Sequence, residues 1–240
     1  MAKKNLLEDI GIDCLLSNLP LNRYEEHQAP SKKLVSSPTI VTSNRESSSL
    51  SEGLRDLKIT LANFEGSSLK KTAINMVFSD GNPDAKVMVV GEAPGADEDR
   101  QGKPFVGQSG QLLRRILSFI GLTIDHVYIT NVLPYRPPGN RQPTPQEIQM
   151  FLPFLQKHIA LIKPKCLLLV GGTACKALLE GQDGITKIRG TWIDLVVPGL
   201  DHPVKAMATY HPAYLLRSPL RKKDVWKDML MVKKFLRTIQ

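Results

Sequence analysis

The feature that most constrains this chain is a series of short, almost entirely apolar segments. They are rich in Val, Ile, Leu and Met, are bounded by Gly, Pro or Asn, and occupy residues 86–90, 127–132, 166–170 and 204–209. Strands without a polar face are typical of parallel sheets that are covered on both sides. Segments with helical periodicity alternate with them, at residues 110–120, 145–162, 174–179 and about 223–236. This alternation predicts an α/β fold, with a mostly parallel sheet between two layers of helices.

The first 50 residues differ in composition from the rest. Residues 6–15 carry apolar side chains at positions that suit one short amphipathic helix. Residues 29–51 are rich in Ser, Pro, Thr and Lys, which is typical of a flexible linker. We therefore expect a short helix and a linker in residues 1–50 and one folded domain in residues 51–240. No motif identifies a protein partner for the tail.

The 240 residues include 32 Lys and Arg against 23 Asp and Glu, a formal net charge of +9. A basic surface favours a polyanion, and nucleic acid is the usual one, although positive charge also serves solubility alone. Charged residues follow the first Lys pair too soon for a signal peptide, and no apolar run reaches membrane-spanning length. We expect a cytoplasmic, nucleoid-associated monomer.

Three cysteines, Cys14, Cys166 and Cys175, are widely separated and form no C-x-x-C pair. Three thiols are too few for a four-cysteine zinc or iron–sulfur site within one chain. Cys166 begins an apolar segment and Cys175 lies among small residues, so we expect both thiols to be buried and reduced.

Chemically distinctive residues follow each of the four predicted strands. Glu92 follows the first strand, Asn131 ends the second, the segment GGT (171–173) follows the third and His211 follows the fourth. Ligands of open α/β sheets bind at the carboxyl ends of the strands. The four segments therefore predict one binding site.

The loops after the first strand suit a planar ligand. GEAPG (91–95) is a tight turn that can bring backbone close to a ligand, or an ordinary strand-to-loop turn; it lacks the spacing of a phosphate loop. Phe105 has Gly and Pro on both sides, which suits stacking on a base better than packing in a core. We expect the charged run between them, residues 97–100, to be solvated.

Polar groups of the later loops suit nucleic acid. The Asn131 carboxamide can pair with the edge of a nucleobase or cap its strand. The loop RPPGNR (136–141) is rigid and basic, and suits a phosphate backbone. GGT (171–173) can bind a phosphate or simply pack a helix on a strand. In HPAYLLR (211–217) a histidine, apolar side chains and an arginine follow each other; a lone His is often structural, but this order fits a base-flipping enzyme.

The motifs GEAPGADEDRQGKPFVG, YITNV, RPPGNR and HPAYLLR, in this order, closely resemble those of the type-4 uracil-DNA glycosylases. The resemblance extends from about Leu54 to the C-terminus. It implies a three-layer αβα sandwich with a central four-stranded parallel sheet, in agreement with the apolar segments. It also implies base-excision repair, in which uracil is flipped out of DNA and its N-glycosidic bond is hydrolysed to leave an abasic site.

The resemblance implies a uracil-binding role for Ala93, Phe105, Asn131 and His211 and a catalytic role for Glu92. Glu92 and the Ala93 amide lie beside the uracil and the attacking water, and Phe105 stacks on the base. Asn131 binds the O4 and N3–H edge of uracil, and His211 donates a hydrogen bond to O2. Of these, Glu92, Asn131 and His211 are the expected catalytic residues.

Four further residues are expected to contact DNA. Leu215 resembles the side chain that fills the gap left in the duplex, and Arg136, Arg141 and Arg217 are expected to bind the phosphate backbone.

The sequence departs from its relatives at two places. Ala93 stands where many type-1 relatives have an aspartate that helps to activate water, so that this role falls to Glu92. Typical type-4 members bind a [4Fe–4S] cluster through four cysteines, and the matching positions hold other residues: Phe64, Ser67, Tyr135 and Phe151. These side chains offer no thiolate, and aromatic rings can fill the vacated space. We expect a member without an iron–sulfur cluster, a metal or another cofactor.

Two alternatives stay open. Related proteins form a lasting covalent link to the abasic sugar, but they carry a histidine-bearing insert after the Asn131 strand, and no histidine lies between His126 and His158. A basic α/β module that only binds DNA or a nucleotide would not need Asn131 and His211 at strand ends.

Overall fold

The computed structural model describes residues 43–179 and 183–239, which belong to one compact unit. Its strands are β1 (Asp80–Gly81), β2 (Val87–Gly91), β3 (Val127–Asn131), β4 (Cys166–Val170), β5 (Trp192–Leu195) and β6 (Val204–Thr209). Its helices are α1 (Ser43–Asn63), α2 (Leu69–Thr72), α3 (Ala96–Gln101), α4 (Gln108–Phe119), α5 (Pro145–Ile162), α6 (Gly172–Leu178), α7 (Ile185–Ile188), α8 (Pro212–Arg217) and α9 (Lys222–Thr238), with short 3-10 turns η2 (Ile124–His126), η3 (Pro138–Asn140) and η4 (Pro219–Arg221).

The four predicted strands form the parallel centre of the sheet. The strand order is β1-β3-β2-β4-β6-β5, and the central strands β3, β2, β4 and β6 pair in parallel. The expected four-stranded sheet is extended at its edges by β1 and β5, which pair antiparallel. Both were missed because β1 has only two residues and β5 is half-exposed, with Asp194 inside it.

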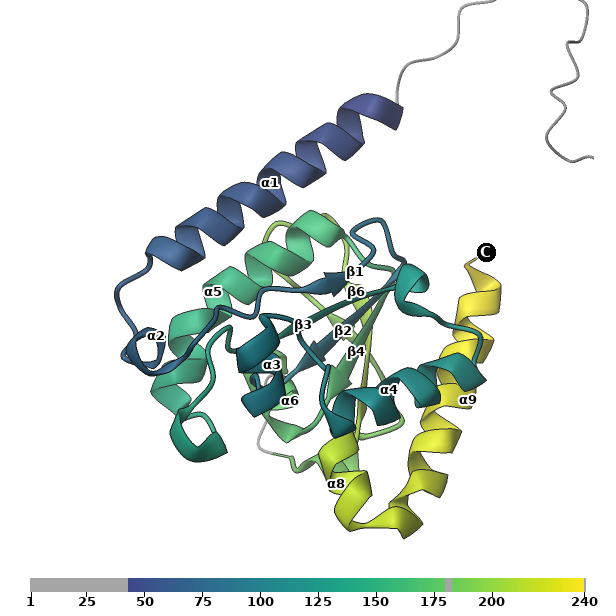
Figure 1. Cartoon of the computed structure of the whole chain (residues 1–240). Coiled ribbons are helices and arrows are strands. Elements are labelled where there is room, and N and C mark those ends of the chain that lie inside the picture. The colour runs from purple at the N-terminus through teal and green to yellow at the C-terminus, as the bar shows by residue number, and fades with distance from the viewer. Residues whose placement is uncertain (1–42, 180–182, 240) are drawn as a thin grey trace, which may run out of the picture. The chain divides into compact units, whose positions relative to one another are not determined.

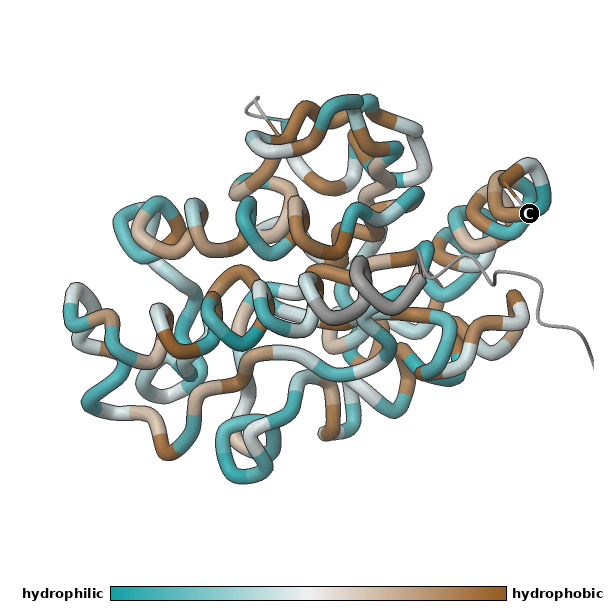
Figure 2. The backbone as a smooth tube through the Cα atoms, turned by 90° about the horizontal axis from the view of Figure 1, so that it is seen from above, coloured by the Kyte–Doolittle hydropathy of each residue, from teal (hydrophilic) through white to brown (hydrophobic). Residues whose placement is uncertain are grey.

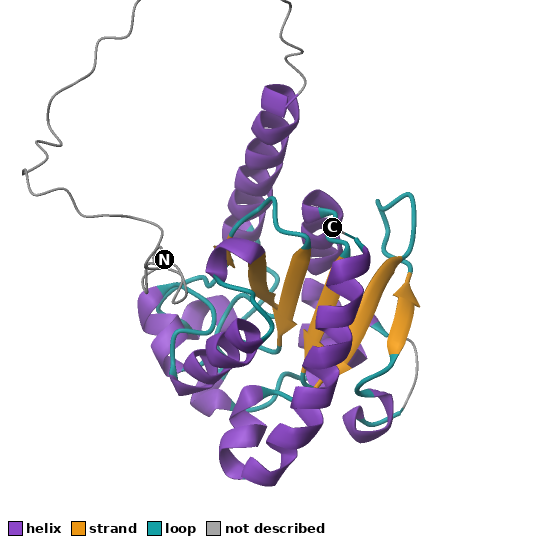
Figure 3. Cartoon of the chain, turned by 90° about the vertical axis from the view of Figure 1, so that its right-hand side faces the viewer, coloured by secondary structure: helices purple, strands orange, loops and turns teal. Residues whose placement is uncertain are grey.

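The sheet lies between two helical layers, as the three-layer prediction requires. Alternate side chains of each strand point to opposite faces, so Met88 and Val90 belong to one core and Val87 and Val89 to the other. Helices α1, α5 and α6 cover the first core, and α4, α8 and α9 cover the second (Figures 1 and 3). The helices change repeatedly between apolar and polar segments, as expected when one side of each helix packs inward (Figure 2).

Helix α1 begins at Ser43, inside the segment that was expected to be linker. Leu54, Leu57 and Leu61 recur every three or four residues and pack in the core beside α5, with Leu50 partly buried one turn earlier. The expected boundary between residues 50 and 51 therefore falls within a helix. The predicted N-terminal helix, most of the linker and Cys14 lie outside the described residues, so the division into two parts stays a prediction.

Helix α3 occupies residues that were expected to be a solvated loop, and that expectation was wrong. Glu98 and Asp99 are only 8% and 2% exposed, because their carboxylates accept backbone hydrogen bonds. The helix predicted at residues 145–162 agrees with α5, which begins with a capping box between Thr144 and Glu147. Cys166 and Cys175 are buried as expected, and burial raises the pKa of both thiols to about 12.

None of the described helices is long and apolar enough to cross a membrane.

Candidate active site

A cleft of about 760 Å³ lies at the carboxyl edge of the parallel strands. Segments that follow β2, β3, β4 and β6 all contribute to its wall. The predicted site residues that line it are Glu92, Ala93, Phe105, Asn131, Arg141, His211 and Arg217. Arg136 and Leu215 are not among the lining residues.

Phe105 lines the cleft but is only 4% exposed and also packs in the core beside α4, so the expectation that it suits stacking better than core packing was wrong. Its backbone conformation is unusual. Phe105 has φ +53°, in the left-handed region that costs a non-glycine residue about 1 kcal/mol or more. Glu98 compensates, since its carboxylate accepts the N–H groups of Val106 (3.0 Å) and Gly107 (2.9 Å) directly after the ring. The same carboxylate accepts the N–H of Gly95 (3.1 Å), so it ties both ends of this loop together.

Gly91 makes room for two of the predicted site residues. A Cβ atom at this position would lie 2.4 Å from Asn131 Oδ1 and 2.5 Å from the Phe105 ring. The last residue of β2 must therefore be glycine for the amide and the ring to approach each other. Asn131 is 7% exposed, and no hydrogen bond from its carboxamide to another described residue is found. Its amide is available to a ligand in the cleft.

His211 is neutral, and its tautomer is fixed. The backbone N–H of Ala213 donates to Nδ1 (3.2 Å), so the proton of the neutral ring is assigned to Nε2. Burial, with a smaller contribution from the positive charge of Arg217, lowers the pKa of His211 to about 4. The ring lies 5.8 Å from that of Phe105 between centroids. This arrangement offers one N–H donor beside an aromatic surface.

Glu92 is half-buried, and its carboxylate has a protein partner. The Thr173 hydroxyl donates a hydrogen bond to Glu92 Oε2. Gly171, two residues before Thr173, has φ +99°, and a Cβ there would lie 3.1 Å from the Cβ of His211. The segment after β4 therefore packs against both Glu92 and His211.

The three predicted DNA-binding arginines differ in their surroundings. Arg217 is exposed at the cleft. Arg141 also lines the cleft, but its guanidinium donates two hydrogen bonds to Glu147 (2.7 and 2.9 Å). Arg136 is 28% exposed and donates to Asn140 Oδ1 (2.7 Å). Of the three, Arg217 is the most accessible to a phosphate.

Comparisons with known proteins agree with this geometry. Residues 78–231 match the family model of the Uracil DNA glycosylase superfamily. The chain is 37% identical to a type-4 uracil-DNA glycosylase of Pyrobaculum aerophilum, over 74% of this chain and 92% of the relative. It is 39% identical to the type-4 enzyme of Thermotoga maritima over 68% and 84%, and 37% identical to that of Archaeoglobus fulgidus over 74% and 90%. The chain belongs to the uracil DNA glycosylase superfamily.

The wedge role expected for Leu215 does not agree with the structure. In this superfamily member Leu215 has no exposed surface and packs in the core between the sheet and α4, α8 and α9. A buried side chain cannot enter a duplex without leaving the core. The role was inferred from the resemblance alone, and α8 is too short for a periodic pattern to show that Leu215 faces inward while Leu216 is 44% exposed.

The four positions that the resemblance assigned to cluster-binding cysteines form a packed region whose side chains do not fit a cluster. Phe151 is fully buried, and its ring centroid lies 6.0 Å from that of Phe64 and 6.2 Å from that of Tyr135. Phe154 adds a fourth ring, 5.2 Å from Phe64. Ser67 is buried, and its Oγ accepts the N–H of Leu69 (3.2 Å). Aromatic rings and a hydroxyl provide no thiolate to iron.

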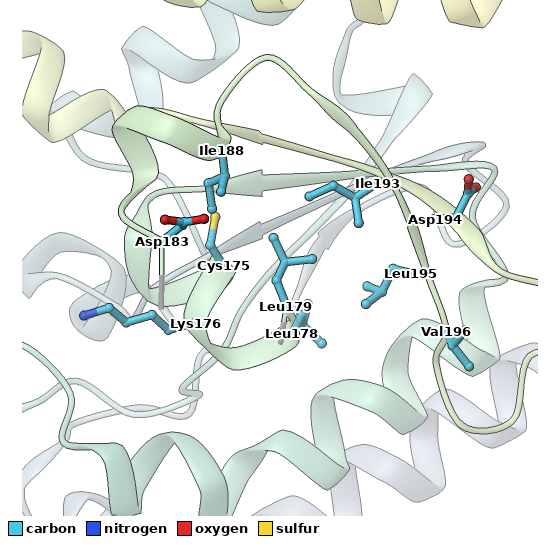
Figure 4. Close-up of a pocket in the computed structure, with 10 residues that line it drawn as sticks. All are labelled: Cys175, Lys176, Leu178, Leu179, Asp183, Ile188, Ile193, Asp194, Leu195 and Val196. Atoms are coloured by element: carbon cyan, nitrogen blue, oxygen red, sulfur yellow. The ribbon is translucent and has the colours of Figure 1, made fainter. Parts of the chain in front are cut away.

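A second cavity, of about 400 Å³, lies between α6, α7 and β5 (Figure 4). Its lining is mostly aliphatic, and the thiol of Cys175 is protonated at neutral pH because of its raised pKa. Asp194 at its edge is paired with Lys205 (2.9 Å). The chemistry expected of this superfamily member therefore belongs to the cleft at the strand ends.

Several residues of the cleft were missed from the sequence. Glu98 was taken for part of a solvated run, although Gly95 followed three residues later by Glu98 is the spacing of a helix start. Asn140 and Tyr214 line the cleft and lie inside quoted motifs, but neither was singled out, and Tyr210 lies just before the HPAYLLR motif. The contact between Thr173 and Glu92 joins segments 81 residues apart, which no local pattern reveals.

Proposed function

We propose that this chain removes uracil from DNA by hydrolysing its N-glycosidic bond, which leaves an abasic site. The observation that carries the proposal is the meeting of three groups in one cleft: the Phe105 ring, the Asn131 carboxamide and the neutral His211 imidazole. A base flipped from the duplex needs a stacking surface and hydrogen-bonding partners for its edge, and these groups supply both. The names of the type-4 relatives support the same reaction.

The proposed reaction follows from where charge develops. Breaking the C1′–N1 bond leaves its electron pair on uracil, so negative charge appears on the base and positive charge on the sugar. The Nε2–H of His211, directed at O2, stabilises the departing anion as it forms. Water adds to C1′, its hydroxyl stays on the sugar, and its proton passes by way of the Glu92 carboxylate to the uracil anion. The ionised Glu92 also favours the positively charged sugar.

Selectivity is assigned to Asn131. Uracil presents O4 as an acceptor and N3–H as a donor, and a carboxamide can pair with both. Cytosine presents a donor and an acceptor in the reverse order, so it would leave buried polar groups unpaired in this orientation of the amide. The backbone N–H of Ala93 lies in the loop beside the same cleft and is assigned to the base or its attacking water.

Backbone contacts are assigned to Arg136, Arg141 and Arg217. The Arg217 side chain can bind a phosphate without rearrangement. The Arg141 guanidinium must first break its hydrogen bonds to Glu147. Action as a monomer stays part of the proposal.

We further propose that the protein contains no iron–sulfur cluster, because its aromatic side chains occupy the region in which relatives hold thiolates. The purified protein is then expected to be colourless and to contain no stoichiometric iron, by visible absorbance and by metal analysis. Brown protein with about four irons per chain would contradict this proposal.

The function is tested by cleavage of oligonucleotides with uracil opposite G, opposite A and in a single strand. Wild-type protein should yield abasic DNA, while His211→Ala and Asn131→Ala should each lower the single-turnover rate by at least about 100-fold. His202→Ala, which changes an exposed histidine, serves as the control. Absence of cleavage by the wild type would favour a module that only binds DNA. A stable protein–DNA band on denaturing electrophoresis would indicate covalent trapping.

A further inference from the structure

Thr173 joins the segment after β4 to a predicted catalytic carboxylate. Its hydroxyl donates to Glu92 Oε2, and both side chains are half-buried. Glu92 lines the cleft, and Thr173 lies directly after the lining residues Gly171 and Gly172. Strands β2 and β4 are neighbours in the sheet, so the two residues leave adjacent strands at the same edge. A hydrogen bond from a hydroxyl can fix the orientation of a carboxylate side chain that would otherwise rotate.

The backbone before Thr173 is suited to hold this contact in place. Gly171 adopts φ +99°, and its N–H donates to the carbonyl of Thr209 (2.9 Å), which fastens the turn to the end of β6. That strand end leads directly to His211. The turn before Thr173 is therefore hydrogen-bonded to the end of β6, the strand that precedes His211.

We propose that Thr173 is a positioning residue that orients Glu92 for the hydrolytic step. This inference rests on the proposed function. A glutamate side chain loses considerable rotamer freedom when it is fixed, and a hydrogen bond to a carboxylate is stronger than one between neutral groups. The bond occupies Oε2 and leaves Oε1 to accept a proton from water. Without the hydroxyl, Glu92 would still be present but would adopt the productive orientation less often.

The proposal is tested with Thr173→Val, which keeps the branched shape but lacks the hydroxyl, and Thr173→Ser, which keeps the hydroxyl. We expect Thr173→Val to lower the single-turnover rate on uracil DNA about tenfold, with Thr173→Ser within about threefold of the wild type. The Kd for a duplex that carries non-cleavable 2′-fluoro-deoxyuridine should stay within about twofold in both variants. Thr191→Val, which removes a hydroxyl bonded to the Ile188 carbonyl away from the cleft, is the matched control.

A double-mutant cycle with Glu92→Ala separates positioning from stability. If Thr173 acts through Glu92, adding Thr173→Val to Glu92→Ala should cause little further loss of rate. Equal losses for the valine and serine variants, or fully additive losses in the double variant, would overturn the proposal, as would an active wild type whose rate Thr173→Val does not change. A wild type with no cleavage would overturn the proposed function as well. Failure of the positioning role alone is recognised because the wild type still cleaves uracil DNA.

Discussion

His211 stays neutral at physiological pH because of its place in the fold. Its ring is largely withdrawn from solvent and lies near Arg217, and these effects lower its pKa to about 4. We expect the His211 ring to titrate near pH 4 in a histidine NMR titration, far below the ordinary value of about 6.5. The His211 signal is assigned by its loss in His211→Ala. A His211 midpoint at or above the ordinary value would contradict the assignment of a neutral donor.

His158 gives a pH prediction for stability rather than activity. It is buried between Phe78, on which it stacks, and the Tyr128 hydroxyl (2.7 Å), and burial lowers its pKa to about 3. The unfolded chain therefore binds a proton more readily than the folded one below the ordinary pKa of 6.5. The stabilising contribution of neutral His158 is complete above this ordinary pKa and is lost as the pH falls toward 3, at up to about 1.4 kcal/mol per pH unit.

This pH effect can be measured by chemical denaturation of the wild type and His158→Gln between about pH 7 and pH 4. The wild type should lose stability more steeply as the pH falls, because the glutamine side chain of the variant takes up no proton. His202→Gln, at an exposed position, is the control. Parallel curves for the wild type and His158→Gln would refute the prediction.

Leu215 and Leu216 are neighbours with opposite surroundings, so they make a matched pair. Leu215→Ala should lower the free energy of unfolding by about 2–5 kcal/mol, because it leaves a cavity in the core. Leu216→Ala should change it by no more than about 0.5 kcal/mol. Both values come from equilibrium denaturation. A Leu215→Ala variant of normal stability that cleaves uracil only in single strands would restore the wedge role.

At the scale of elements, the aromatic cluster joins the end of α1 to α5. Phe151 lies at its centre with no exposed surface, so Phe151→Ala should cost about 3–5 kcal/mol of unfolding free energy. Phe119→Ala, at a position that is 64% exposed, should cost less than about 1 kcal/mol. Denaturation with and without a chelator provides the measurement, and we expect the chelator to change neither result. A large chelator effect would indicate a structural metal.

The elements that the sequence predicted are those with a strong periodic or apolar signal. The central strands and α5 have such a signal and were predicted within a residue or two at each end. Strands β1 and β5 and helices α3 and α8 lack it, since they are short or carry polar residues that tertiary contacts bury. Glu98 illustrates the difference: its charge suggests solvent, whereas its burial depends on backbone donors that come together only in the folded loop.

The strand-end residues of the site were predicted for a similar reason. Parallel strands carry their carboxyl ends to one edge, so Glu92, Asn131 and His211 could be grouped from topology alone. The direction in which each side chain points could not be predicted from topology. Leu215 differs from its predicted surroundings because the pitch of a short helix, and not its composition, decides which side chain faces the core.

At the scale of the whole molecule, the positive charge predicts salt-dependent binding to DNA. The formal charge is +9, and Arg217 is exposed beside the cleft. We expect Arg217→Ala to reduce the slope of log Kd against log salt by about one, since one phosphate contact is lost. Arg237→Ala, at the far end of α9, should leave the slope unchanged. An unchanged slope for Arg217→Ala would mean that Arg217 does not contact a phosphate.

The distribution of the cleft over four strand ends has a consequence for how activity arises. Glu92 and His211 stand at opposite ends of a long stretch of sequence, with four strands and several helices between them. Contacts between residues so far apart in sequence form late in folding, because the entropy of closing a long loop is lost before the contacts stabilise the chain. We therefore expect a nascent or partly folded chain to lack uracil-excising activity. The reaction requires molecules in which the sheet is complete. Specific activity therefore also measures the fraction of fully folded protein.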